Sequence, residues 1–213
     1  MSAGPTGVGT PTRRLTREEK KALTRRELLD AAARVFLRRG FFAASLDEVA
    51  EEAGFSKGAV YSNFSDKEDL LLALIEDRAE LRRQRVFELV DADAPLDVQA
   101  REGGQAFNHI LEEEREWAPL FLEFWVCVAR NPALEARFAP RYRAMKSAIA
   151  TQLQDGALHA GRELPIAAER LATALFAIGN GFSLERLADP DLADDDLFGA
   201  MLAVFFAGLK ASQ

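Results

Sequence analysis

The chain has very little of several things that often define a function class. Its 213 residues include one cysteine, so no disulfide can form within the chain, and only two histidines, so the supply of metal ligands is small. No apolar run is long enough to span a bilayer, and the first residues lack the apolar core of a signal peptide. We therefore expect a cytoplasmic protein without a metal centre or a membrane partner.

Catalytic motifs are also missing. The sequence has no phosphate-binding loop, no Gly-x-Ser-x-Gly nucleophile turn and no His-Glu-x-x-His zinc motif. His109 beside Glu112 and Glu113 is typical of a solvated helix face, and Cys127 has no evident base and is typical of a small core residue. We therefore expect neither an enzyme nor a cofactor, and an all-α enzyme is the least favoured alternative.

Strand-like alternation is absent over any useful length, so the predicted fold class is all-α. Apolar residues recur at helical spacing, and Gly and Pro mark the breaks between helices. Residues 1–15 are rich in Gly, Pro, Ser and Thr and are predicted to form a disordered tail. The predicted helices, about nine in all, cover residues 17–39, 46–53, 57–64, 66–90, 96–115, 118–130, 133–160, 166–188 and 194–210.

Helix boundary signals are dense in residues 45–72. Gly54 is placed to take the left-handed conformation that ends one helix and turns the chain. Three serines stand where helices could begin, and two of them match the capping box with a glutamate three residues later: Ser45 with Glu48, Ser65 with Glu68, and Ser56 alone. The pattern predicts a helix-turn-helix, whose second helix can enter a DNA major groove.

Residues from about 24 to 75 resemble the DNA-binding domain of the TetR (tetracycline repressor) family of bacterial transcription regulators. The matching pieces are RRELLDAAARVFLRRGF and SLDEVAEEAGFSKGAVYSNFSDKEDLLLALIE. The resemblance implies a helix-turn-helix domain in residues 16–65 and a ligand-binding and dimerisation domain in residues 66–213, with the fourth helix as connector. It also implies a transcription regulator, by family default a repressor that a small, largely apolar effector releases from its operator.

The net charge of −7 disfavours DNA binding at first sight, but the charge is unevenly distributed. Residues 1–44 carry a net +6, residues 45–70 a net −5, and residues 71–213 a net −8. A basic end on an acidic body can orient itself on a polyanion, because attraction depends on the local face. A solvated tail and helix face would explain the charge cluster alone, but beside a helix-turn-helix the distribution favours DNA.

The candidate DNA contacts lie in and around the predicted recognition helix. Lys57 could reach a guanine edge or a phosphate, and the small Gly58 and Ala59 would let the helix approach the bases closely. The resemblance implies phosphate contacts by Tyr61 and by Lys67. The full set of candidates is Arg25, Arg26, Ser45, Ser56, Lys57, Gly58, Ala59, Tyr61, Ser62, Asn63 and Lys67. Structural alternatives remain open: crowding at the turn for Gly58, core packing for Tyr61, and capping alone for Ser45 and Ser56.

A single recognition helix reads too few base pairs, so we expect a homodimer on a palindromic operator of double-stranded DNA. The last two long helices, LATALFAIGNGFSLERLADP and DLFGAMLAVFFAGL, are apolar on more than one face. Such helices need cover on all sides, which a second subunit can provide. The alternative is that one of them lies at the centre of its own domain.

Aromatic residues are concentrated in the middle of the chain, with a few polar groups among them. An apolar cavity with a few polar anchors is the usual form of a small-molecule site, although aromatic residues at helical spacing are often plain core. The candidate effector site comprises His109, Trp117, Phe121, Phe124, Trp125, Met145, Phe176 and Asn180. A regulator whose C-terminal domain binds a protein partner instead remains the alternative function.

Overall fold

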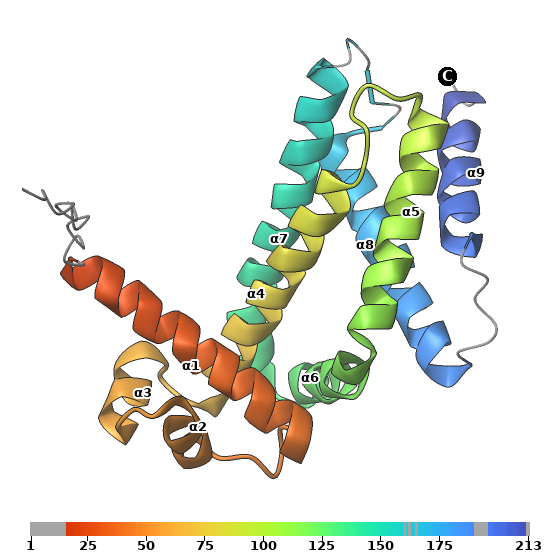
Figure 1. Ribbon diagram of the computed structural model, residues 1–213. Helices are drawn as coiled ribbons and strands as arrows, with labels where there is room; N and C mark the ends of the chain where they lie inside the picture. The colour runs from red at the N-terminus through yellow and green to blue at the C-terminus, as the bar shows by residue number, and fades with distance from the viewer. Residues whose placement is uncertain (1–15, 160, 162, 165, 190–195, 212–213) are drawn as a thin grey trace, which may run out of the picture.

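The computed structural model describes residues 16–159, 161, 163–164, 166–189 and 196–211, and within them the fold is all-α, as predicted (Figure 1). The predicted tail, residues 1–15, lies outside the described residues. The described elements are α1 (Arg17–Arg39), α2 (Leu46–Ala53), α3 (Lys57–Asn63), α4 (Lys67–Glu88), α5 (Leu96–Glu113), a 3-10 turn η1 (Arg115–Trp117), α6 (Ala118–Arg130), α7 (Pro132–His159), α8 (Ala168–Ala188) and α9 (Leu197–Ala211). Their ends lie within three residues of those predicted.

Local capping chemistry explains where the first helices begin and end. Ser45 caps α2 in a capping box, because its hydroxyl accepts the Glu48 N–H while the Glu48 carboxylate accepts the Ser45 N–H. Gly54 ends α2 in the left-handed conformation, with φ of 71°, and Ser56 caps α3. These three predictions describe the turn correctly.

The predicted cap of α4 is wrong by one residue. Asp66 is the N-cap, and its carboxylate accepts the Asp69 N–H at 2.6 Å. Ser65 and Glu68 do not form the expected capping box; the Ser65 N–H is instead accepted by the Asp69 carboxylate at 3.1 Å. An aspartate satisfies the free N–H groups as well as a serine does, and it also suits the positive end of the helix.

The N-terminal head, residues 16–75, is built on one apolar core. Val60 and Phe64 of the α3 region are buried with Leu28 and Phe36 of α1. The core does not stop at the head, because Phe124 of α6 and other buried residues of α6 and α7 belong to the same cluster. Any movement of α6 or α7 therefore changes the packing of the head directly.

Polar contacts also join the head to the body. The Glu123 carboxylate of α6 accepts the backbone N–H of Phe41 at 2.5 Å. Two arginines of α7 bond the first turn of α4: Arg137 to Asp66 and Arg141 to Asp69, each at 2.9 Å. Burial of Asp66 opposes its ionisation, but Arg137 and the Asp69 N–H outweigh that effect and lower the pKa of this carboxyl. Both aspartates are thus held ionised against their arginines at neutral pH.

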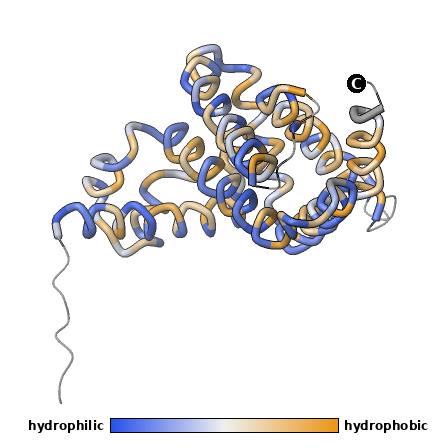
Figure 2. Tube along the Cα trace, turned by 90° about the horizontal axis from the view of Figure 1, so that it is seen from above, coloured by the Kyte–Doolittle hydropathy of each residue, from blue (hydrophilic) through white to orange (hydrophobic). Residues whose placement is uncertain are grey.

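The body is a bundle of α4–α9, in which α9 packs along α5 and α8 along α7 (Figures 1 and 2). The α5 and α9 backbones touch at two glycines, because a Cβ on Gly104 would lie 2.3 Å from the Cα of Gly199. Phe198 and Phe206 of α9 are buried beneath this contact. No helix in the described part of the chain is long and apolar enough to cross a membrane.

Candidate functional site

One face of α3 is free of the rest of the chain. Lys57, Gly58, Tyr61 and Ser62 are exposed, with Tyr61 keeping 58% of its surface accessible, while Val60 on the opposite face is fully buried. The alternative that Tyr61 is core is therefore wrong. The Lys57 ammonium forms an exposed ion pair with Asp47, which costs little to exchange for another anion because such pairs contribute little.

Gly58 occupies open space. A Cβ built there would meet only the Ser56 hydroxyl, at 3.8 Å, which is an ordinary van der Waals contact. Its backbone has no positive φ that would require glycine. Crowding within the turn therefore does not explain this glycine. The absence of a side chain matters only to something that approaches the α3 face from outside.

Two of the predicted contact residues bond the backbone of α3 itself. The Ser62 hydroxyl donates to the Ala59 carbonyl at 2.9 Å, and the Asn63 side-chain amide donates to the same carbonyl at 2.8 Å. The Asn63 side-chain oxygen is buried without a hydrogen-bond partner. In this state neither side chain presents a free donor to a groove, in contrast to our expectation. Ala59 itself is partly exposed at the edge of the face.

The two α1 arginines contact other parts of the chain. Arg25 donates to the Asn63 carbonyl at 3.2 Å and lies over the Phe64 ring at 4.4 Å, so it supports the end of α3. Arg26 bonds Asp77 of α4 at 2.6 Å on the surface. Neither geometry excludes a phosphate contact, but both arginines already have a structural role.

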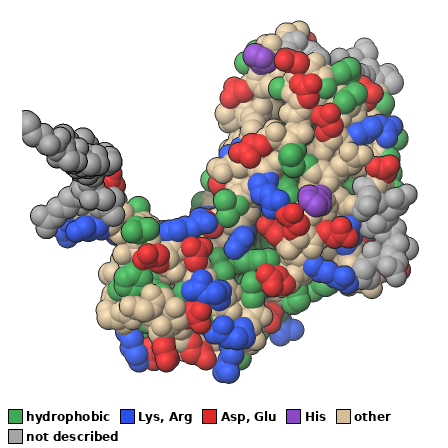
Figure 3. All heavy atoms as spheres, in the orientation of Figure 1, with side chains coloured by type: hydrophobic (Ala, Val, Ile, Leu, Met, Phe, Trp, Pro, Cys, Tyr) green, Lys and Arg blue, Asp and Glu red, His purple; other side chains and the backbone are tan. Residues whose placement is uncertain are grey.

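Much of the positive charge of α1 is neutralised by α2. Arg34 and Arg38 both bond Glu52, and Arg39 lies 3.5 Å from Glu48. Figure 3 accordingly shows acidic and basic side chains mixed over the visible face of the head. The basic end inferred from the sequence is therefore less positive at the C-terminal half of α1 than a charge count suggests.

Lys67 is bonded to the backbone of the head. Its ammonium donates to the carbonyls of Phe41, Phe42 and Ala44, at 2.9, 3.3 and 2.9 Å, and it lies 4.5 Å above the Phe41 ring. All three donors of the ammonium are used within the chain in this state. Lys67 closes the α1–α2 turn onto α4, and its contact with a phosphate stays a prediction.

We expect Lys67→Met to lower the free energy of unfolding by about 2 kcal/mol, because three carbonyls lose a charged donor. Urea denaturation measures this loss. The matched control is Lys57→Met, which removes an exposed pair and should change stability by less than about 0.5 kcal/mol. Equal effects of the two substitutions on stability would contradict the structural assignment of Lys67.

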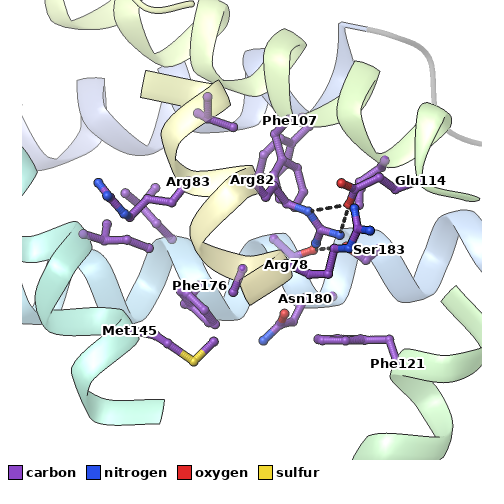
Figure 4. Close-up of a pocket in the computed structure, with 18 of the residues that line it drawn as sticks. Arg78, Arg82, Arg83, Phe107, Glu114, Phe121, Met145, Phe176, Asn180 and Ser183 are labelled. Carbon is purple, nitrogen blue, oxygen red and sulfur yellow. Dashed lines mark hydrogen bonds and ion pairs between the residues drawn. The ribbon is translucent and has the colours of Figure 1, made fainter. Parts of the chain in front are cut away.

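The body contains a partly open cavity of about 730 Å³, the central cavity, between α4 and the helices α5–α9. Its wall is mainly apolar, and its size is ordinary for a small-molecule site. Seven of the eight predicted effector residues line it: Trp117, Phe121, Phe124, Trp125, Met145, Phe176 and Asn180. Figure 4 shows Phe121, Met145, Phe176 and Asn180 around it.

The eighth residue, His109, is misplaced in our prediction. Its side chain is 66% exposed, pairs with Glu113 one turn along α5, and does not line the central cavity. The i,i+4 spacing places both residues on the outer face of the helix. The alternative weighed from the sequence, a surface histidine beside a glutamate, is the correct one.

The sequence analysis missed the charged groups of the central cavity. Arg78 and Arg82 of α4 and Arg186 of α8 line it, together with Glu114. Arg82 donates to Glu114 at 2.6 and 3.2 Å (Figure 4). The run of arginines on α4 has the pattern of a solvated helix face, and only the packing of α5 and α8 against it shows which of them point inward.

Comparison with known proteins assigns the fold and both halves of the chain. Bacterial regulatory proteins of the tetR family match residues 28–74, and the C-terminal domain of the BetI-type transcriptional repressor matches residues 105–209. The chain belongs to the TetR family. It is therefore a helix-turn-helix, DNA-binding transcriptional regulator, with α2 and α3 as the helix-turn-helix.

Relatives cover nearly the whole chain. The HTH-type transcriptional repressor AcnR of Corynebacterium diphtheriae is 29% identical over 195 residues, which span 90% of this chain and 94% of AcnR. The HTH-type transcriptional activator FasR of Mycolicibacterium smegmatis is 28% identical over 190 residues, or 89% and 84% of the two chains. A solved TetR-family structure from Rhodococcus sp. has the same fold, with a TM-score of 0.69, 21% identity and coverage of 88% and 98%.

Proposed function

We propose that this TetR-family protein is a homodimeric repressor that binds a palindromic operator in the cytoplasm and is released by a small, largely apolar effector. The observation that carries the DNA end is the α3 face, where Lys57 and Tyr61 flank a glycine whose missing side chain the fold does not require. A helix that can approach base edges without a steric barrier suits readout in the major groove.

Dimerisation is supported by the outer faces of α8 and α9. On α9, Leu197, Met201 and Val204 form one exposed apolar stripe, and Val204 keeps 67% of its surface accessible. On α8, small Ala177 and Gly181 lie exposed along one side of the helix. Exposed apolar residues at helical spacing beside small ones allow close packing of a second copy, which would bury both stripes.

Release by an effector is supported by the position of α4. Its first half belongs to the core of the head, and its second half lines the central cavity. A ligand that prefers one position of α4 shifts the population of head positions by its difference in affinity for the two states. A cavity of this size favours a small molecule over the alternative of a protein partner bound by the C-terminal domain.

The sign of regulation is proposed as repression, because AcnR and the BetI-type C-terminal domain both carry that description. FasR, of similar identity, is described as an activator. A reporter gene placed behind the operator distinguishes the two, because deletion of the regulator raises expression under repression and lowers it under activation.

The test of DNA binding is its salt dependence on a duplex of mixed sequence. Each phosphate contact releases counterions, so we expect affinity to fall steeply as salt rises. Lys57→Ala and Tyr61→Ala should each weaken binding about tenfold. Lys57→Ala should also reduce the salt slope, which is the slope of log affinity against log salt concentration, by about one for each head. The Arg85→Met variant is the control, because Arg85 pairs with Glu113 outside the head and its salt slope should not change. An affinity that does not vary with salt would contradict the proposal.

A further inference from the structure

The central cavity holds an excess of positive charge within an apolar wall. Among its lining residues are five arginines and two glutamates. A guanidinium taken out of water is costly unless an anion or several hydrogen-bond acceptors compensate it. The partners of these arginines therefore show which guanidinium groups are compensated within the chain and which are not.

Three of these arginines have partners within the chain, and one of them, Arg83, pairs with Glu80 at 2.6 Å. Arg82 donates two hydrogen bonds to Glu114, whose side chain is only 10% exposed. Arg186 donates to the buried Asn108 and lies 3.3 Å from Glu112. Both glutamates of the cavity are therefore already paired and cannot neutralise a third arginine.

Arg78 has no acceptor in the described part of the chain. Its guanidinium lies over the Trp117 ring, 4.0 Å from the ring centroid, in a cation–π contact. Its Nε is fully buried and has no hydrogen-bond partner, and no carboxylate in the described part of the chain pairs with it. Figure 4 shows it among Arg82, Glu114 and Ser183. The donors open to a ligand are therefore the two Nη groups, which are not fully buried and carry an unpaired positive charge at the wall of the central cavity.

We propose that the effector is an amphipathic organic anion, with a carboxylate head that binds Arg78 and an apolar body that lies against the aromatic wall of the central cavity. A carboxylate matches the end-on fork of the two Nη groups, and it accepts two hydrogen bonds. A cationic effector would be repelled by the surplus arginines, and a neutral one could accept a hydrogen bond from Arg78 but would not neutralise its charge.

The proposed effect of the anion on DNA binding rests on the proposed release by an effector, whereas the binding of the anion does not. Arg78 lies on α4, one turn before Arg82 and just after the half of the helix that packs in the head. An anion held there acts on the helix that positions α3. Binding itself is independent of DNA and is measured without it.

The experiment is isothermal titration of the full chain with two matched series of ligands, below any micelle-forming concentration. One series is dodecanoate, dodecan-1-ol and dodecylammonium, and the other is 2-naphthoate, 2-naphthalenemethanol and 2-naphthylmethylammonium. We expect the anion to bind about tenfold to a hundredfold more tightly than its neutral and cationic counterparts in at least one series, as a charged hydrogen-bonded pair provides.

Arg78→Met should remove this preference while the melting temperature stays equal or rises, because the substitution deletes a buried donor that has no acceptor. Arg78→Lys should keep part of the preference, since the charge remains and the fork is lost. The control is Arg85→Met, which lies on the same helix outside the central cavity, pairs with Glu113, and should keep the full preference.

Equal binding of anion, alcohol and ammonium in both series, or an unchanged preference in Arg78→Met, would overturn the inference. Anion binding through Arg78 that leaves operator affinity unchanged would support the inference and contradict release by the effector. Release of DNA by a neutral molecule, with no preference for anions, would support release by an effector and contradict this inference.

Discussion

Gly58→Leu is expected to lower operator affinity by more than about a hundredfold in the dimer, because each subunit would place a bulky side chain between α3 and the base edges. The fold should be unaffected, since a side chain at this position meets only the Ser56 hydroxyl. Replacing a helical glycine should even stabilise the chain slightly. Operator binding by fluorescence anisotropy and the melting temperature together measure the two effects.

The matched control is Gly156→Leu. Gly156 also lies in a helix, and a Cβ there meets nothing within 4 Å. It lies in α7, far along the chain from the head, and its substitution should leave DNA binding unchanged while stabilising the chain slightly, as Gly58→Leu should. Wild-type DNA affinity in Gly58→Leu would show that the α3 face does not enter a groove.

The double substitution Met201→Glu and Val204→Glu is expected to convert the dimer into a monomer of 23.5 kDa. The two side chains are 55% and 67% exposed in one subunit, so a charge there costs little in the monomer. In the proposed dimer the same charges would be buried against their own copies, at a cost of several kcal/mol. Sedimentation equilibrium measures the mass.

The double substitution should also lower operator affinity by about a hundredfold or more. A monomer has one head, and it lacks the high effective concentration that links the two heads of a dimer. Leu158→Glu is the control: Leu158 is 65% exposed near the end of α7, outside the α8 and α9 stripes, and should leave mass and affinity unchanged. A dimer that survives the double substitution would place the interface elsewhere.

Features of the fold that depend on neighbouring residues in sequence could be predicted. The Ser45 capping box and the left-handed Gly54 involve groups three or four residues apart, so the sequence determines them directly. The cap of α4 was misplaced because Ser65, Asp66, Glu68 and Asp69 offer two overlapping capping patterns. The arginines of α7, distant in sequence, also bond both aspartates, and no local pattern shows these contacts.

Features of the site that depend on long-range packing could not be predicted. Lys67 follows the recognition helix by a few residues, as a phosphate contact would, yet its ammonium is held by carbonyls more than 20 residues away. Arg78 and Arg85 look alike in an arginine-rich helix, but only Arg78 lines the central cavity. The aromatic wall was predictable, because its large apolar residues are recognisable before their neighbours are known.

The central claim is that the exposed face of α3 reads duplex DNA as one half of a symmetric pair. Selection of bound fragments from a pool of random duplexes tests it most directly. The account predicts enrichment of an inverted repeat whose half-sites are centred about one turn of DNA apart or slightly more. Recovery of a single unrepeated site, or no enrichment over the starting pool, would contradict it.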